Sequence, residues 1–215
     1  MTAKIKLNAA SGGGSFSLQA PSSSSNNRVI SLPDIADGTL LTSQSSLDST
    51  KLSPAIAAGI TQADTWRLTS NFSLPTSSTV LTSNFERSDG ATATYIGSGM
   101  SESSGVFTFP TTGKWIVLVF ASYYQSSGDT PYAIVDTQVS SDSGSSYDYI
   151  ARQNDELGGG GRQSGSSSCS PIIDVTNASN FRVRFRAFSG HSNCNLIGDS
   201  GENRTCFIFI RLGDT

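Results

Sequence analysis

The strongest hydrophobic pattern in the chain lies in residues 104–120, SGVFTFPTTGKWIVLVF. It predicts a short strand, a tight turn at Pro110–Gly113 and a second strand over Trp115–Phe120. A strand on a sheet surface alternates apolar and polar residues, because only one of its faces is buried. The second strand is apolar at every position, so both of its faces should be covered. If the same chain covers the second face, the protein can be a monomer. If another copy covers it, the protein is an oligomer.

Residues 65–215 carry the pattern of an all-β domain. Short apolar or alternating runs recur along this part of the chain, and Gly, Ser, Asp and Asn separate them. About eight to ten strands are expected, the number typical of a sandwich or jelly roll. The predicted strands are Trp66–Leu68, Thr79–Leu81, Thr94–Ile96, Gly105–Phe109, Lys114–Ser122, Ala133–Val139, Tyr147–Ala151, Ser170–Val175, Phe181–Phe188 and Thr205–Leu212.

Residues 1–42 form a separate block of three or four very short predicted strands with polar turns. Each strand offers only two or three apolar side chains, so a single copy buries too little surface to fold alone. We expect this block to fold against other copies of itself or against another protein. Its apolar residues, the predicted attachment set, are Ile5, Leu7, Phe16, Leu18, Val29 and Leu32.

Residues 43–64 join the two parts. Leu52, Ile56 and Ile60 recur every four residues, and Ser53-Pro54 is a good N-cap and first-turn pair for a helix. The segment is predicted to be a short helix or a linker, and the linker is the favoured interpretation.

Composition restricts the function. The charged fraction is only 14% and the net charge is −3, so nothing favours nucleic-acid binding, while 9% aromatic residues argue against disorder. No apolar stretch reaches the roughly 20 residues that cross a membrane, and the N-terminus lacks a signal-peptide core, which predicts synthesis in a cytoplasm without membrane insertion. The odd cysteine count favours free thiols in Cys169, Cys194 and Cys206 over a Cys169–Cys194 bridge.

No motif predicts catalysis. His191 is the single histidine and lies in a turn-rich stretch without a nucleophile motif. Acidic residues are scattered over predicted loops, where solvated turn positions are favoured over a glycosidase pair or a calcium site. We therefore expect no enzyme, no catalytic residue, no cofactor and no metal ligand.

Two groups of residues are candidates for contact with another molecule. Tyr123 and Tyr124 combine aromatic faces with hydroxyls, which suits sugar binding. Arg182, Arg184 and Arg186 alternate along one predicted strand and form a basic stripe suited to acidic glycans or phosphates. The alternatives are packing at sheet edges for the tyrosines, and a solvated face or ion pairs within an oligomer for the arginines.

Residues 105–115, GVFTFPTTGKW, resemble the signature of C1q/TNF-like jelly rolls, in which a Gly-x-Phe-Thr segment precedes proline, glycine and an aromatic strand. Thr205–Gly213 looks like the closing strand of the same domain, and Asp174–Asn177 with Val183–Phe185 fits its penultimate hairpin. The resemblance covers residues 65–215 and implies a jelly-roll knob that assembles as a homotrimer.

The N-terminal block resembles the leader of structural proteins from tailed phages of marine bacteria, through FSLQAP at residues 16–21 and ISLPDIADGTLLT at residues 30–42. This resemblance implies a virion protein: a tail fibre or spike whose N-terminus docks on other virion proteins and whose knob contacts a host-surface glycan. A capsid decoration protein is the alternative, and a polysaccharide-cleaving enzyme a remote one. The set expected to pack the core and the trimer is Trp115, Val117, Val119, Phe120, Phe185, Phe207 and Phe209.

Overall fold

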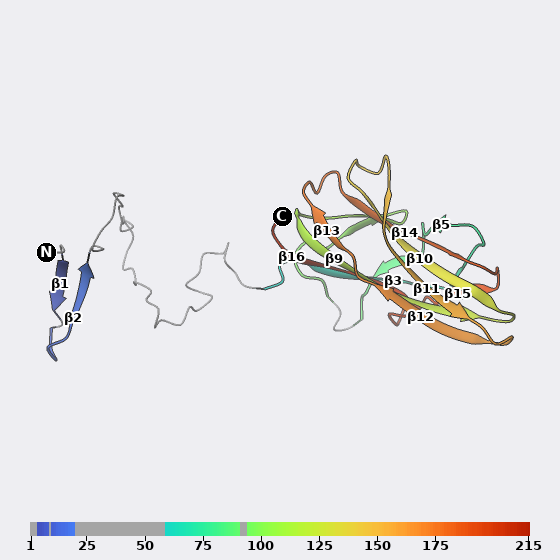
Figure 1. The fold of residues 1–215 in the computed structure, drawn as a ribbon, viewed down its shortest axis with the longest axis horizontal. Coiled ribbons are helices and arrows are strands. Elements are labelled where there is room, and N and C mark those ends of the chain that lie inside the picture. The colour runs from blue at the N-terminus through green and yellow to red at the C-terminus, as the bar shows by residue number, and fades with distance from the viewer. Residues whose placement is uncertain (1–3, 9, 20–58, 91–93) are drawn as a thin grey trace. The chain divides into compact units, whose positions relative to one another are not determined.

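The computed structural model describes residues 4–8, 10–19, 59–90 and 94–215. The chain divides into two units, Met1–Ala57 and Ala58–Thr215. In the first unit, strand β1 (Lys4–Asn8) pairs antiparallel with β2 (Ser15–Gln19). The described residues of the second unit form two antiparallel sheets without a helix, so none of them lies in a helix that could cross a bilayer (Figure 1). The predicted helix or linker over 43–64 lies mostly outside the described residues.

The smaller sheet of the second unit has six strands, centred on β14, which is hydrogen-bonded to β10, β8 and β5. Its strand order follows, with β5 beside β14 and off the main path: β11 (Asp148–Leu157), β10 (Thr130–Ser140), β14 (Arg182–Ser189), β8 (Val106–Thr108), β7 (Ser101–Ser103), and β5 (Thr79–Val80).

The larger sheet has eight strands and is built around β9 (Gly113–Gln125), the most hydrophobic run of the sequence. One edge of β9 pairs with β16 and β15, and the other with β12 and β13. The remaining strands of this sheet are β3 (Ala63–Leu68), β4 (Phe72–Ser73), β6 (Phe85–Arg87), β12 (Gln163–Cys169), β13 (Ile172–Val175), β15 (Cys194–Leu196) and β16 (Cys206–Gly213).

The hydrophobic core fills the space between the two sheets. Every second residue of β9 from Trp115 to Tyr123 is buried, because alternate side chains of a strand point to the same side. Phe185 of the smaller sheet meets Phe207 of the larger one with ring centroids 4.2 Å apart. Phe107 lies among them, 5.1 to 5.8 Å from the rings of Trp66, Phe85, Phe185 and Phe209.

The turn that leads into β9 is fixed by local contacts. The rings of Phe109 and Trp115 meet edge to face at 5.3 Å, and the indole Nε1–H of Trp115 donates to the carbonyl of Thr111 at 3.2 Å. Gly105 has a φ of +80°, and a side chain there would overlap the carbonyl of Leu81. Gly105, in the turn between β7 and β8, is therefore required by the backbone at the first glycine of the sequence signature.

The predicted strands differ from the observed ones mainly where apolar residues are lacking. β12 has the sequence QSGSSSC, which carries no hydrophobic alternation, yet it pairs with β9 at seven consecutive positions. Thr94–Ile96 is not a strand, and only Ile96 forms an isolated bridge with Ala63. The knob's first strand begins at Ala63, two residues before the expected boundary.

Replacing the ring at the centre of the core should sharply reduce stability. We expect Phe107→Ala to lower the free energy of unfolding by about 3–5 kcal/mol, because it leaves a cavity among five aromatic rings. Phe107→Leu keeps most of the volume and should cost clearly less. Denaturant titration followed by tryptophan fluorescence measures both; equal losses for the two variants would contradict this packing.

Candidate functional site

Among the described residues of the second unit, the second face of β9 is only partly covered. Ile116, Leu118 and Phe120 point away from the core, on the side opposite Trp115, and Phe120 is 42% exposed. We call this surface the open face. It comprises Ile116, Leu118, Phe120, Ile172, Ile208 and Ile210.

Cross-strand register makes the open face continuous. Ile116 of β9 lies between Ile172 of β13 and Ile210 of β16, while Leu118 lies opposite Ile208. Ile172, at the end of this row, is 63% exposed, a high value for an aliphatic side chain next to other apolar residues. Side chains in directly opposite positions pack together, so these residues form one surface rather than isolated exposed groups.

Polar groups border the open face. Lys114 and Asp174 form a half-exposed ion pair at 2.9 Å at one end of the Ile116 row. Arg67, opposite Cys206 in the register, is buried and hydrogen-bonds to Glu86 and Asp89. Burial acts against the charge of Arg67, but these two carboxylates outweigh it and raise the pKa of the guanidinium. An apolar centre with a charged rim is the usual anatomy of a protein–protein contact.

The residues expected to pack the core and the trimer lie in two different places in the structure. Six of its members lie inside a single chain and are buried: Trp115, Val117, Val119, Phe185, Phe207 and Phe209. Phe120 alone belongs to the open face. Sequence reasoning did not select its partners Ile172, Ile208 and Ile210. The alternation of isoleucine with phenylalanine in β16 indicated Ile208 and Ile210.

One candidate for host contact is wrong. Tyr123 is fully buried on the core side of β9, and its hydroxyl lies 2.9 Å from the Ser167 hydroxyl. The reason is the two-residue period of the strand, which places neighbours in sequence on opposite faces. Tyr124 does point outward and accepts a hydrogen bond from Arg162 Nε at 2.7 Å. It lies on the side of Phe120, in a different sheet from the three arginines.

The three arginines line the outer side of the smaller sheet. Arg182, Arg184 and Arg186 alternate along β14 with buried Val183 and Phe185. Their cross-strand neighbours on β10 are Ser140, Gln138 and Asp136. We call this surface the arginine face; its further members are Tyr147, Tyr149 and Arg152.

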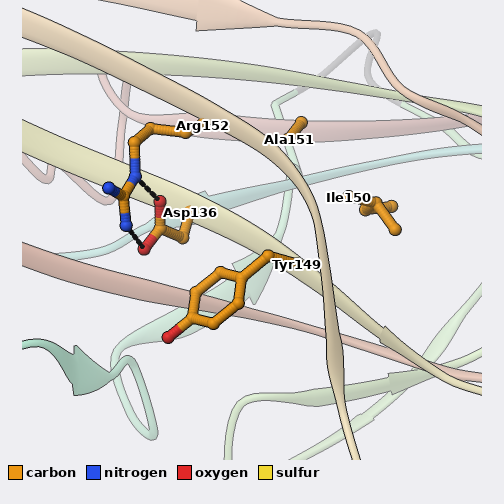
Figure 2. A pocket seen from close by; sticks show the side chains of 5 residues that line it. All are labelled: Asp136, Tyr149, Ile150, Ala151 and Arg152. Atoms are coloured by element: carbon orange, nitrogen blue, oxygen red, sulfur yellow. Dashed lines mark hydrogen bonds and ion pairs between the residues drawn. The ribbon is translucent and has the colours of Figure 1, made fainter.

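A hollow of about 400 Å³ opens on the arginine face beside Asp136. Figure 2 shows the guanidinium of Arg152 holding both oxygens of the Asp136 carboxylate, at 2.6 and 2.9 Å, with the ring of Tyr149 alongside. Asp136 is fully buried, whereas the side chain of Arg152 is 55% exposed. Hydrogen bonding to Asp136 raises the pKa of Arg152 and so favours its charged form.

Local hydrogen bonds hold two acidic side chains of the loops. Asp142 accepts hydrogen bonds from Ser140 and Ser146, which lower its pKa to about 2, and the amides of Gly159 and Gly160 lower that of Asp129. His191 is exposed. Within the described ranges, no group of His, Cys, Asp and Glu is placed to hold a metal ion.

The three cysteines are free thiols in the structure. Burial raises the pKa of Cys194 to about 11, and it also raises the pKa values of Cys169 and Cys206. A thiol with a raised pKa is a poor nucleophile at neutral pH, which fits a packing role.

The N-terminal hairpin presents apolar residues without cover in the described part of its unit. Ile5 is 64% and Leu7 59% exposed, and they pair in register with Leu18 and Phe16. A lone two-stranded hairpin is marginally stable in water. Val29 and Leu32 of the attachment set lie outside the described residues.

Comparison with known proteins supports the fold. No protein-family model matches the chain, and no curated protein matches it. Among solved structures, the chain is similar to the Eiger TNF of S. frugiperda, with 11% identity, a TM-score of 0.52, and coverage of 71% of this chain and 93% of that one. The chain is also similar to murine APRIL, with 8% identity, a TM-score of 0.49, and coverage of 70% of this chain and 98% of that one. The predicted C1q/TNF-like sandwich is confirmed.

The Asp136–Arg152 pair should respond asymmetrically to mutation. Arg152→Ala leaves a fully buried carboxylate without its partner, which should cost about 3 kcal/mol of unfolding free energy. Asp136→Asn leaves a half-exposed guanidinium that water can solvate, so we expect about 1 kcal/mol. Urea denaturation of the two variants at pH 7 measures the difference. A larger loss for Asp136→Asn would show that the carboxylate is not dependent on Arg152.

Proposed function

We propose that this chain is a structural protein of a tailed-phage virion, a homotrimeric tail fibre or spike. Its N-terminal block docks on other virion proteins, and its jelly-roll knob faces outward toward the host surface. The observation that carries the proposal is the open face, a row of apolar side chains across β13, β9 and β16 that the described residues of the second unit leave exposed at Ile172 and Phe120 and half-buried elsewhere.

Burial of the open face gives assembly its driving force. Each buried aliphatic or aromatic side chain contributes roughly 1.5–3 kcal/mol relative to exposure to water. Cover for this face comes from two further copies of the knob, which is the assembly that the sequence resemblance to C1q/TNF-like proteins implies. Trimerisation thus buries the second face of the apolar run over Trp115–Phe120.

The N-terminal unit supports the docking role. Its described hairpin exposes Ile5 and Leu7 and is too small to be stable without a partner. The resemblance of residues 16–21 and 30–42 to phage leaders supports the virion as the source of that partner. The chain is made in the host cytoplasm and becomes part of the particle during assembly.

A charge placed in the open face should break the trimer. We expect wild-type protein to have a trimeric mass in solution and Leu118→Asp to be monomeric, because a buried, unpaired carboxylate costs about 3 kcal/mol or more. Tyr132→Asp, at an exposed aromatic of the smaller sheet, is the matched control and should stay trimeric. Sedimentation equilibrium measures the masses, and circular dichroism checks folding. A monomeric wild type at micromolar concentration would refute the trimer.

Removing the N-terminal block should leave folding of the knob intact but prevent its incorporation into particles. Deletion of residues 1–42 should leave a soluble knob that no longer enters particles, because the compact second unit begins only at Ala58. Purified particles analysed by immunoblot and electron microscopy measure incorporation. A deleted chain that still enters particles would refute the docking role. Particles that instead lose head stability without the chain would identify a capsid decoration protein.

A further inference from the structure

The arginine face carries positive charge that the chain does not neutralise. Arg182, Arg184 and Arg186 occupy successive outward positions of β14, about 6.8 Å apart in an extended strand. Among the described residues, no carboxylate lies within ion-pair distance of these three side chains. Like charges in neighbouring positions of a sheet repel one another, so this stripe costs stability unless an anion joins it.

Neutral groups hold the guanidinium groups of Arg184 and Arg186 in place. Arg184 Nε donates to Gln138 Oε1 at 2.9 Å, and its guanidinium carbon lies 3.6 Å from the ring centroid of Tyr147. Arg186 donates to the hydroxyl of Tyr149 and, at 2.8 Å, to the carbonyl of Ser78. Acceptors without charge orient an arginine and leave its full positive charge available to a ligand.

The hollow in Figure 2 offers space for a ring of a bound ligand beside this charge. Its volume of about 400 Å³ falls within the range of small-molecule sites. Tyr149, 54% exposed, offers an aromatic face at its edge. The Asp136 carboxylate does not repel an anion there, because it is buried and both of its oxygens bind Arg152. Arg186 Nε is buried close by and has no partner among the described residues.

We propose that the arginine face binds an acidic glycan. Arg184 and Arg186 would pair with its carboxylate, sulfate or phosphate groups, and Tyr149 would contact a sugar ring in the hollow beside Arg152. Guanidinium groups match these anions with paired N–H donors, and tyrosine faces suit the apolar side of a sugar ring. The inference rests on the proposed outward position of the knob, and it names the class of surface molecule that the knob recognises.

The arrangement favours a glycan over a nucleic acid or an acidic protein. The positive charge without an ion pair among the described residues of this face lies on β14, in a chain whose net charge is −3. A stiff duplex that extends beyond the stripe therefore meets repulsion, whereas a flexible glycan chain can contact the stripe alone. Moreover, the face lies on the smaller sheet, whereas the open face belongs to the larger one. A trimer formed through the open face therefore leaves the arginine face accessible.

Binding of the purified full-length protein to immobilised polysaccharides tests the proposal. We expect retention at 150 mM salt on polygalacturonate, a carboxylated glycan, or on dextran sulfate, and none on neutral dextran or duplex DNA. The double variant Arg184→Gln/Arg186→Gln should bind at least about tenfold more weakly, since it loses two charge-assisted contacts. Arg204→Gln, at an exposed loop arginine paired with Glu202, is the matched control and should bind like wild type.

Three results would overturn the proposal: no binding to either acidic glycan, equal binding by the double variant, or equal retention on duplex DNA. Circular dichroism confirms that the double variant is folded, and sedimentation confirms that its mass equals that of wild type. Since glycan binding is measured on purified protein, its failure leaves particle incorporation untouched. Loss of incorporation with intact glycan binding would instead refute the virion role alone.

Discussion

Aromatic packing between the two sheets is the interaction on which the rest of the structure depends. Phe107, Phe185 and Phe207 meet at the centre of the sandwich and hold the larger sheet, with β9 in its middle, against the smaller one. Once that face is committed to the core, the strand's two-residue period forces Ile116, Leu118 and Phe120 to the other side. The open face is therefore a direct consequence of how the core is built.

The two outer surfaces of the sandwich have opposite chemistry. The larger sheet presents aliphatic and aromatic side chains, and the smaller sheet presents arginines held by tyrosine, glutamine and backbone carbonyl groups. Such a division suits a knob that assembles through one sheet and meets its surroundings through the other. In the proposed trimer, the surface that drives assembly and the surface that binds glycan do not compete.

The sequence predicted the fold because its strongest patterns were local. The Gly105–Trp115 signature, the apolar run of β9 and the alternation in β14 and β16 lie in strands that the structure contains. β12 could not be predicted, since its serines carry no hydrophobic period and pairing with β9 alone makes it a strand. Tyr123 and Tyr124 show another limit: the residue types suggested a common surface role, but only register decides which of two neighbours points outward.

The arginine face illustrates how much of a site depends on strand pairing. Alternation identified Arg182, Arg184 and Arg186 as a stripe, but the sequence could not place Tyr149 and Arg152 beside them. Those contacts come from the antiparallel register of β10 with both β11 and β14. The open face was only partly predicted for the same reason, because Ile172 reaches Ile116 through a strand pairing across more than 50 residues of sequence.

The claim that copies of the chain cover the open face is tested most directly by hydroxyl-radical footprinting of the wild-type protein in solution. Phe120 is 42% and Tyr149 54% exposed in one chain, so the two side chains should be labelled to similar extents if nothing covers either. We predict that Phe120 is protected while Tyr149 is labelled, and that Leu118→Asp restores labelling of Phe120. Equal labelling of Phe120 and Tyr149 in the wild-type protein would contradict the account.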